Sequence, residues 1–209
     1  PRSTLFPYTT LFRSPSPNHD LAMMNKGESQ NRWHGLIILT LMFLMSCFFS
    51  TRTGQPSPAS ANAPEAEFSS ARAMSILVEI ARQAHPPGSP EHERVRGYLV
   101  DRLTTLGLDP EIQTSTSSFQ RRTMARTATV RNVIARLPGT ASTGAILITA
   151  HYDSRGLAVG AGDDGTGIVS ILETLRAIQT GPPLRNDVIV LFTDAEELGL
   201  LGARAFVNE

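Results

Sequence analysis

The sequence predicts an α/β fold in which a mixed β-sheet with a parallel core is flanked by helices. Two β-type runs, residues 128–137 and 145–150, flank Pro138-Gly139 and Gly144, which predicts antiparallel neighbours joined by a short loop. From residue 145 the order becomes strand, helix, strand, helix. This alternation is typical of parallel strands joined by crossover helices, and it predicts the parallel core.

Two helices are expected between residue 67 and this sheet. The first should end before Pro86-Pro87-Gly88. Its apolar face is predicted to comprise Met74, Leu77, Val78 and Ala81. The second should begin with Ser89 as N-cap and Pro90 at its first helical position, and Gly107 is placed to end it. Its buried stripe is predicted to comprise Val95, Tyr98, Leu99, Leu103 and Leu106.

Two more helices and one more strand follow the run at 145–150. The first helix is expected to turn a set of apolar residues inward: Ile168, Ile171, Leu172, Leu175 and Ile178. The strand is predicted at residues 187–193, and the last helix lies near residues 200–207. These elements complete a domain predicted over residues 67–209.

The N-terminal third of the chain is expected to lie outside that domain. Residues 4–14 (TLFPYTTLFRS) resemble the translation of a sequencing adapter, so residues 1–22 are treated as an artefact and the natural start as Met23 or Met24. Residues 36–49 are almost wholly apolar, and residues 23–50 therefore form a membrane-targeting segment. A transmembrane anchor, a cleaved signal peptide and a lipoprotein signal ending at Cys47 all remain open. Residues 51–66, rich in Pro, Ala and Ser, have the composition of a linker.

Charge and cysteine content restrict the chemistry. The chain has 19 acidic and 19 basic residues, which gives no reason to expect a nucleic-acid partner. Residues 145–209, however, contain nine acidic and four basic residues, and this excess of negative charge would suit a bound dication. Because Cys47 is the single cysteine, any metal must be held by His, Asp and Glu.

Three polar clusters occupy positions where strands lead into helices, which is where ligand sites of open α/β sheets collect. His151 and Asp153 directly follow the strand at 145–150, and an imidazole there could bind zinc while a carboxylate holds its other N–H. Taken alone, this pair favours an ordinary strand-end histidine that is hydrogen-bonded to a loop. The glycine-rich run 160–167 contains Asp163, whose carboxylate could bridge two metals, although an N-cap is the simpler interpretation.

The third cluster is Asp194 to Leu200, after the apolar strand. Adjacent Glu196 and Glu197 can divide two tasks, because one can bind metal while the other takes a proton from water and delivers it to a leaving amine. A solvated acidic helix start would explain this pair alone. The combination of the three clusters is far more specific than any one of them.

Together these residues resemble the di-zinc aminopeptidases of metallopeptidase family 28, a family that shares its zinc-exopeptidase (phosphorylase/hydrolase-like) fold with glutaminyl cyclases and some metal-free receptor ectodomains. The resemblance covers residues 68–209. It rests on His85-Pro-Pro-Gly-Ser-Pro-Glu-His92, His151-Tyr-Asp-Ser, Gly165-Thr-Gly167 and Glu196-Glu-Leu-Gly-Leu-Leu-Gly202. The first motif and the loop 181–186 are most similar to the membrane-anchored branch, which favours the anchor.

The resemblance implies the role of each residue. His151 would bind one zinc ion, Asp163 would bridge two, Glu197 would bind the second, Glu196 would act as general base and acid, and Asp153 would orient His151. Asp164 would follow Asp163 across an unusual peptide bond. The family's remaining Asp and His ligands would lie beyond residue 209. The chain is therefore expected to be a C-terminally truncated fragment that retains zinc weakly and has little activity.

The implied function is hydrolysis of N-terminal peptide bonds of peptides or small proteins by an extracytoplasmic domain, either membrane-anchored through residues 36–49 or secreted. Two alternatives remain. A glutaminyl cyclase would use a single zinc ion, but Asp164 to Gly167 and Gly199 to Gly202 are more similar to peptidases. A non-catalytic ectodomain of the same fold should have lost ligands that are present here.

Overall fold

The computed structural model describes residues 17–52 and 57–208, in two units divided after Pro56. The adapter-like residues 4–14 lie outside the described residues. The first unit contains helix α1, Pro17–Arg52. Its stretch Trp33–Arg52 is long and apolar enough to cross a membrane, with a mean hydropathy of 1.8 and none of it buried. A signal sequence near the N-terminus would have the same length and composition, so this helix does not separate the anchor from the signal peptide.

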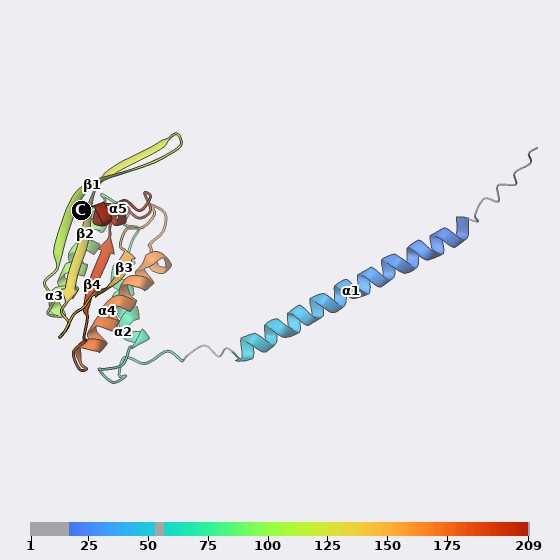
Figure 1. Cartoon of the computed structure of the whole chain (residues 1–209), viewed down its shortest axis with the longest axis horizontal. Helices are drawn as coiled ribbons and strands as arrows, with labels where there is room; N and C mark the ends of the chain where they lie inside the picture. The colour runs from blue at the N-terminus through green and yellow to red at the C-terminus, as the bar shows by residue number, and fades with distance from the viewer. Residues whose placement is uncertain (1–16, 53–56, 209) are drawn as a thin grey trace, which may run out of the picture. The chain divides into compact units, whose positions relative to one another are not determined.

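The second unit is a four-stranded mixed sheet flanked by helices (Figure 1). Its elements are α2 (Ser70–Ile80), α3 (Pro90–Thr105), β1 (Glu111–Arg121), β2 (Met124–Leu137), β3 (Ala145–His151), a short irregular turn (Ala161–Gly165), α4 (Thr166–Gln179), β4 (Asp187–Thr193) and α5 (Leu201–Asn208). The strand order is β1-β2-β4-β3. β3 pairs with β4 in parallel, and the other two pairings are antiparallel. The predicted mixed sheet with a parallel core is confirmed.

The predicted pairing of residues 128–137 with 145–150 is wrong, because β4 lies between β2 and β3. The crossover through α4 returns β4 next to β3 in parallel. β4 is apolar from residue 188 to residue 192 and buried at all but one of its positions, so the centre of the sheet is where its side chains are best covered. Strand β1 was not predicted. It alternates Ser and Thr with few apolar residues, and most of it is exposed.

Helix α3 has the predicted ends. Ser89 Oγ accepts the N–H of His92 at 3.1 Å, and Pro90 occupies the first turn. At the other end, the N–H of Leu108 donates to the Leu103 carbonyl and that of Gly107 to the Thr104 carbonyl, with Gly107 at φ 76°. This is a Schellman ending, which requires the left-handed conformation that glycine adopts without strain.

Helix α2 buries a different face from the one predicted. Met74 and Val78 are 56% and 62% exposed. The buried residues are Ala73, Ile76, Leu77 and Ile80. Both sets have the spacing i, i+3, i+4, i+7 and share Leu77, so the apolar pattern alone could not choose between them. The observed face joins the main core, to which α3, α4 and the central strands also contribute.

Residues 57–66, which the composition assigns to a linker, lie within the second unit. Arg72 donates to the carbonyls of Ala61 and Ala63, and Arg176 donates to that of Glu65. Both guanidinium groups also pair with the buried carboxylate of Glu173 on α4. The backbone of this segment therefore has specific hydrogen-bond partners on the domain.

Candidate active site

The candidate site forms where β3 and β4 end. His151, the last residue of β3, is in register with Thr193, the last residue of β4. Because the two strands are parallel, the segments 152–165 and 194–200 leave the same edge of the sheet. All five residues predicted for the site belong to these segments or to His151 itself. They therefore arise from neighbouring positions in the fold.

The imidazole of His151 is buried and held at both nitrogens. Nδ1 lies 3.0 Å from the carbonyl oxygen of Asp153, and Nε2 lies 2.9 Å from Oδ1 of Asp163. A carbonyl can only accept, so Nδ1 carries a proton, and in a neutral ring the Nε2 lone pair would face the Asp163 carboxylate. Burial lowers the pKa of His151, but the nearby carboxylates of Asp153 and Asp163 outweigh burial and raise that pKa to about 9. The pair thus attracts a cation, either a proton or a metal.

The carboxylate of Asp153 serves mainly the neighbouring loop. Oδ1 accepts the N–H of Glu196 at 2.9 Å, and Oδ2 accepts that of Glu197 at 3.0 Å. Its distance to His151 Nδ1 is longer, at 3.5 Å. Orientation of the imidazole therefore comes chiefly from the Asp153 carbonyl. The carboxylate instead fixes the two glutamates relative to β3.

Asp163 and Asp164 lie in the irregular turn before α4 and are joined by a cis peptide bond, the unusual bond that the resemblance implied. The Asp163 side chain is 81% exposed, so its second oxygen is open to a ligand. Asp164 turns back, and its Oδ2 accepts the N–H of His151 at 3.3 Å. Gly167 leaves room for that carboxylate, because a Cβ at residue 167 would lie 2.3 Å from Asp164 Oδ1.

The two glutamates have different surroundings. The carboxylate of Glu197 is mostly buried and its Oε2 lies 2.6 Å from Nε of Arg155, a side chain that is 75% exposed. Within residues 17–52 and 57–208, no hydrogen bond or ion pair holds the Glu196 carboxylate. Burial raises the pKa of Glu196, against the lowering effect of His151. A carboxylate with a raised pKa can take up and release a proton more readily near neutral pH.

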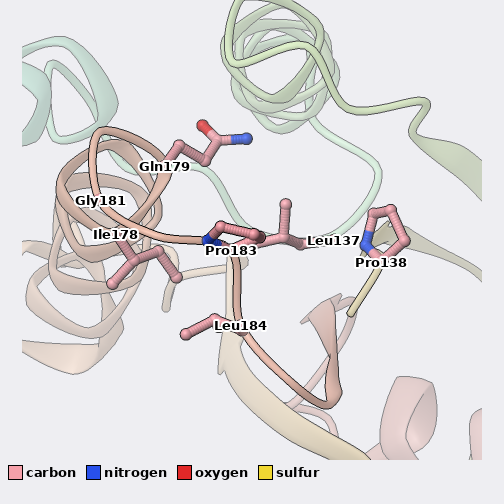
Figure 2. Close-up of a pocket in the computed structure, with 7 residues that line it drawn as sticks. All are labelled: Leu137, Pro138, Ile178, Gln179, Gly181, Pro183 and Leu184. Atoms are coloured by element: carbon pink, nitrogen blue, oxygen red, sulfur yellow. The ribbon is translucent and has the colours of Figure 1, made fainter. Parts of the chain in front are cut away.

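A hollow of about 380 Å³ connects the acids, with Arg155, Asp163 and Glu197 on its wall beside the backbone of residues 158–162. Figure 2 shows a second hollow, of about 300 Å³, between the end of β2 and the loop after α4. It is lined by apolar residues, Gln179 and Gly181, at the amino end of β4. Because its lining contains no carboxylate and no imidazole, this second hollow lacks groups that could bind a metal ion or transfer a proton.

The predicted metal ligands are only partly brought together. His151 and Asp163 form a close pair, whereas Glu197 turns to Arg155. Across the described parts of the chain, no three His, Cys, Asp or Glu side chains are grouped as metal ligands. The donor set nevertheless suits zinc, because an imidazole nitrogen and a carboxylate oxygen 2.9 Å apart can share one ion at ligand distances of roughly 2.0 to 2.2 Å.

Several residues that support the site were not predicted as part of it. His92 Nε2 lies 2.9 Å from Asp194 Oδ1, and the His92 ring stacks on Tyr152 at 4.7 Å between centroids. Asn132 accepts the N–H of Asp194 and donates to the Gly202 carbonyl. The motif at 85–92 contained a signal for His92. Nothing in the sequence pointed to Asn132, because its partners are 62 and 70 residues away.

Comparison with known proteins gives both a family and structural relatives. The model of peptidase family M28 matches residues 132–209. Vacuolar membrane proteases of Meyerozyma guilliermondii and Yarrowia lipolytica are 37% and 31% identical over 147 and 195 residues, covering 64% and 82% of this chain but 15% and 19% of those proteins. The chain thus spans less than a quarter of the length of these curated relatives.

Solved structures give the same fold. The glutaminyl cyclase of Porphyromonas gingivalis is 27% identical with a TM-score of 0.53, over 61% of this chain and 45% of that one. A Zn-dependent exopeptidase from Parabacteroides distasonis is 21% identical with a TM-score of 0.53, over 62% and 48% of the two chains. At this level of identity the second likeness establishes the fold alone.

Proposed function

Because the chain belongs to peptidase family M28, matched over residues 132–209, we propose that the protein is a zinc-dependent exopeptidase that removes residues from the amino end of peptides. One observation carries the proposal. His151 Nε2 faces the Asp163 carboxylate at the edge of the sheet where Glu196 and Glu197 also emerge. A cation held there would lie beside a carboxylate suited to move a proton.

In this proposal His151, Asp163 and Glu197 would hold zinc, and Asp163 would serve as a ligand common to two ions. Bound zinc supplies Lewis acidity, which polarises a substrate carbonyl and makes nearby water more acidic. Glu197, which contacts Arg155 in this structure, would be a ligand of the second ion. Glu196, whose pKa burial raises, takes the proton from the attacking water and returns it to the leaving amine. Asp153 keeps both glutamates in place through their backbone N–H groups.

The proposed location follows from α1 and from the names of the relatives. The relatives are described as vacuolar membrane proteases, which supports association with a membrane. We infer that residues 23–50 hold the protein in the bilayer and that residues 67–209 are part of an extracytoplasmic catalytic domain. The substrates would then be peptides or small proteins outside the cytoplasm.

The test uses the protein in its complete reading frame and a peptide offered with either a free or an acetylated amino end. The free peptide should lose its first residue and the acetylated one should not. Glu196→Gln should lower kcat roughly 100- to 10,000-fold, because the proton carrier is lost. Zinc content, measured by elemental analysis, should be unchanged in this variant. Full activity in Glu196→Gln, or equal cleavage of both peptides, would refute the proposal, and Glu111→Gln on exposed β1 is the matched control.

A second candidate, glutaminyl cyclisation, is favoured by one observation, the likeness to glutaminyl cyclase structures at 27% and 25% identity. The same protein can be given a peptide that begins with glutamine. A cyclase would release ammonia and leave the peptide length unchanged, whereas a peptidase would release free glutamine. Mass spectrometry separates the two products.

A further inference from the structure

The hairpin of β1 and β2 extends past the edge of the sheet that carries the site. β2 pairs with β4 only from Val133 to Leu137, so residues 124–132 continue beyond the end of β4 with β1 as their partner. Figure 1 shows the hairpin projecting past α5 and the loop before it. The site loop, residues 194–200, therefore lies beneath the inner part of this projection.

Two contacts join the hairpin to that loop, and a third joins it to α5. Arg126 Nη1 donates to the carbonyl of Glu197 at 3.3 Å. Phe119, which is opposite Arg126 in the hairpin, packs so closely on Gly199 that a Cβ at residue 199 would lie 2.7 Å from its ring. The guanidinium of Arg204 on α5 lies 4.8 Å from the centroid of the same ring. Phe119 and Arg126 are thus on the face of the hairpin turned toward the site.

Arg121 and Met124 form the next pair on that same face. They are opposite each other in the hairpin, two residues beyond Phe119 and Arg126, and side chains two apart on a strand share a face. The added distance is roughly 7 Å, about two residues of an extended peptide. Both side chains are exposed, and no residue in the described parts of the chain pairs with the Arg121 guanidinium. They therefore lie on the side of the hairpin that faces the loop with Glu196 and Glu197, beyond the point where the hairpin contacts that loop.

The charge of the hairpin is one-sided. Between Glu111 and Asp153 the sequence contains no acidic residue but has arginines at 121, 122, 126, 131 and 136. Among the residues that the structure describes, Arg136 at the far end of β2 is the one of these five that forms an ion pair, with Asp187. An unpaired guanidinium with a thioether beside it offers a carboxylate a charged partner and a peptide stem an apolar one.

We propose that the projecting end of the hairpin is a binding arm for the part of a peptide that extends beyond the cleaved bond, and that Arg121 selects peptides with a carboxylate there. The carboxylate is that of an Asp or Glu side chain a few residues downstream, or of the carboxyl end of a short peptide. This inference rests on the proposed peptidase function. It adds a substrate class, acidic peptides, to that function.

The test compares two variants that each lower the charge by one at adjacent residues. Arg121→Gln removes the guanidinium on the face turned to the site, and Gln120→Glu adds a carboxylate on the opposite face. Each is measured on peptide pairs that share an amino-terminal residue and differ downstream as Asp or Asn, with the carboxyl end free or amidated. Arg121→Gln should reduce the preference for Asp over Asn about fivefold, through KM and with kcat unchanged. Gln120→Glu should leave the preference within about twofold of the parent.

Binding without turnover separates this inference from the chemistry. In the Glu196→Gln background, fluorescence anisotropy should show that a labelled peptide with Asp downstream binds more tightly than the same peptide with Asn in its place. Adding Arg121→Gln should remove this difference. If no peptide is cleaved but this binding preference exists and depends on Arg121, the arm stands and the peptidase proposal fails. If the preference for acidic peptides survives Arg121→Gln, or falls equally in Gln120→Glu, the proposed binding arm is refuted. This holds even if the protein is an active peptidase.

Discussion

At the scale of single residues, Asp153 illustrates how one side chain can join two strand ends. It leaves β3, yet both of its oxygens accept backbone N–H groups of the loop after β4. The side chain is fully buried, so these are charge-assisted bonds formed away from competing water. Asp153 therefore acts on Glu196 and Glu197 through their backbone, whatever ligand the site holds.

Replacing Asp153 with Asn should be costly although the volume hardly changes. The amide has one oxygen, so its NH₂ group would face one of the two N–H donors. We expect a loss of about 2 to 3 kcal/mol in the free energy of unfolding. Denaturant unfolding of the purified protein measures this loss, and Asp101→Asn on the exposed side of α3 is the control. Equal stability of the two variants would show that the loop is held by other contacts.

At the scale of elements, Gly202 sets how closely α5 approaches the sheet. Its N–H donates to the carbonyl of Asp194 at 2.8 Å, and its carbonyl accepts from Asn132 Nδ2 at 2.9 Å. A Cβ at residue 202 would lie 2.3 Å from the Asp194 carbonyl oxygen and 2.4 Å from Asn132 Oδ1. Neither atom is the flexible end of a long side chain, so the helix itself would have to move.

Gly202→Ala should therefore destabilise the protein by about 3 kcal/mol, the upper part of the range for overpacking. Gly162→Ala is the matched control, because it is next to Asp163 yet a Cβ at residue 162 would have no neighbouring atom within 4 Å, and its φ is not positive. Thermal unfolding should separate the two variants clearly. A Gly202→Ala protein as stable as Gly162→Ala would mean that α5 can shift without loss.

Among the helices and strands, those that depend on local sequence patterns could be predicted from the sequence. The capped ends of α3 and the strand-helix alternation after residue 145 depend on local patterns, and both are confirmed. The pairing of β2 was predicted wrongly because strand neighbours are decided by the crossover through α4, which a loop between two β-type runs does not reveal. The prediction of which face of α2 is buried was wrong, because two faces with the same apolar spacing overlap at Leu77.

For the candidate site, the sequence located its members but not their partners. His151, Asp163 and the glutamate pair follow strands, and strand ends can be inferred from apolar runs. The pairing of Glu197 with Arg155, and the backbone bonds made by Asp153, depend on side-chain directions within loops. No spacing rule encodes those directions. The ligand roles themselves stay predictions until metal binding is measured.

At the scale of the whole domain, a buried ion cluster joins its first residues to its centre. Glu173 on α4 is 2% exposed and accepts from Arg72 on α2, from Arg176 and from the N–H of Ser69. The same arginines donate to carbonyls between residues 61 and 67. Since α2 and the preceding segment are both held by this one carboxylate, its ionisation should affect the stability of the whole domain.

Burial raises the pKa of Glu173, but the bonds from Arg176, Arg72 and Ser69 outweigh burial and lower that pKa from 4.5 to about 2. A lowered folded-state pKa stabilises the fold above the unfolded-state value near 4.5, and the contribution is lost as the pH falls from there toward 2. The difference in unfolding free energy between the parent and Glu173→Gln should therefore shrink by about 2 kcal/mol between pH 6 and pH 3. Denaturant unfolding at both pH values measures it, with Glu79→Gln, which alters the exposed pair of Glu79 and Arg82, as control. A difference that is independent of pH would mean that Glu173 contributes through packing and not through its charge.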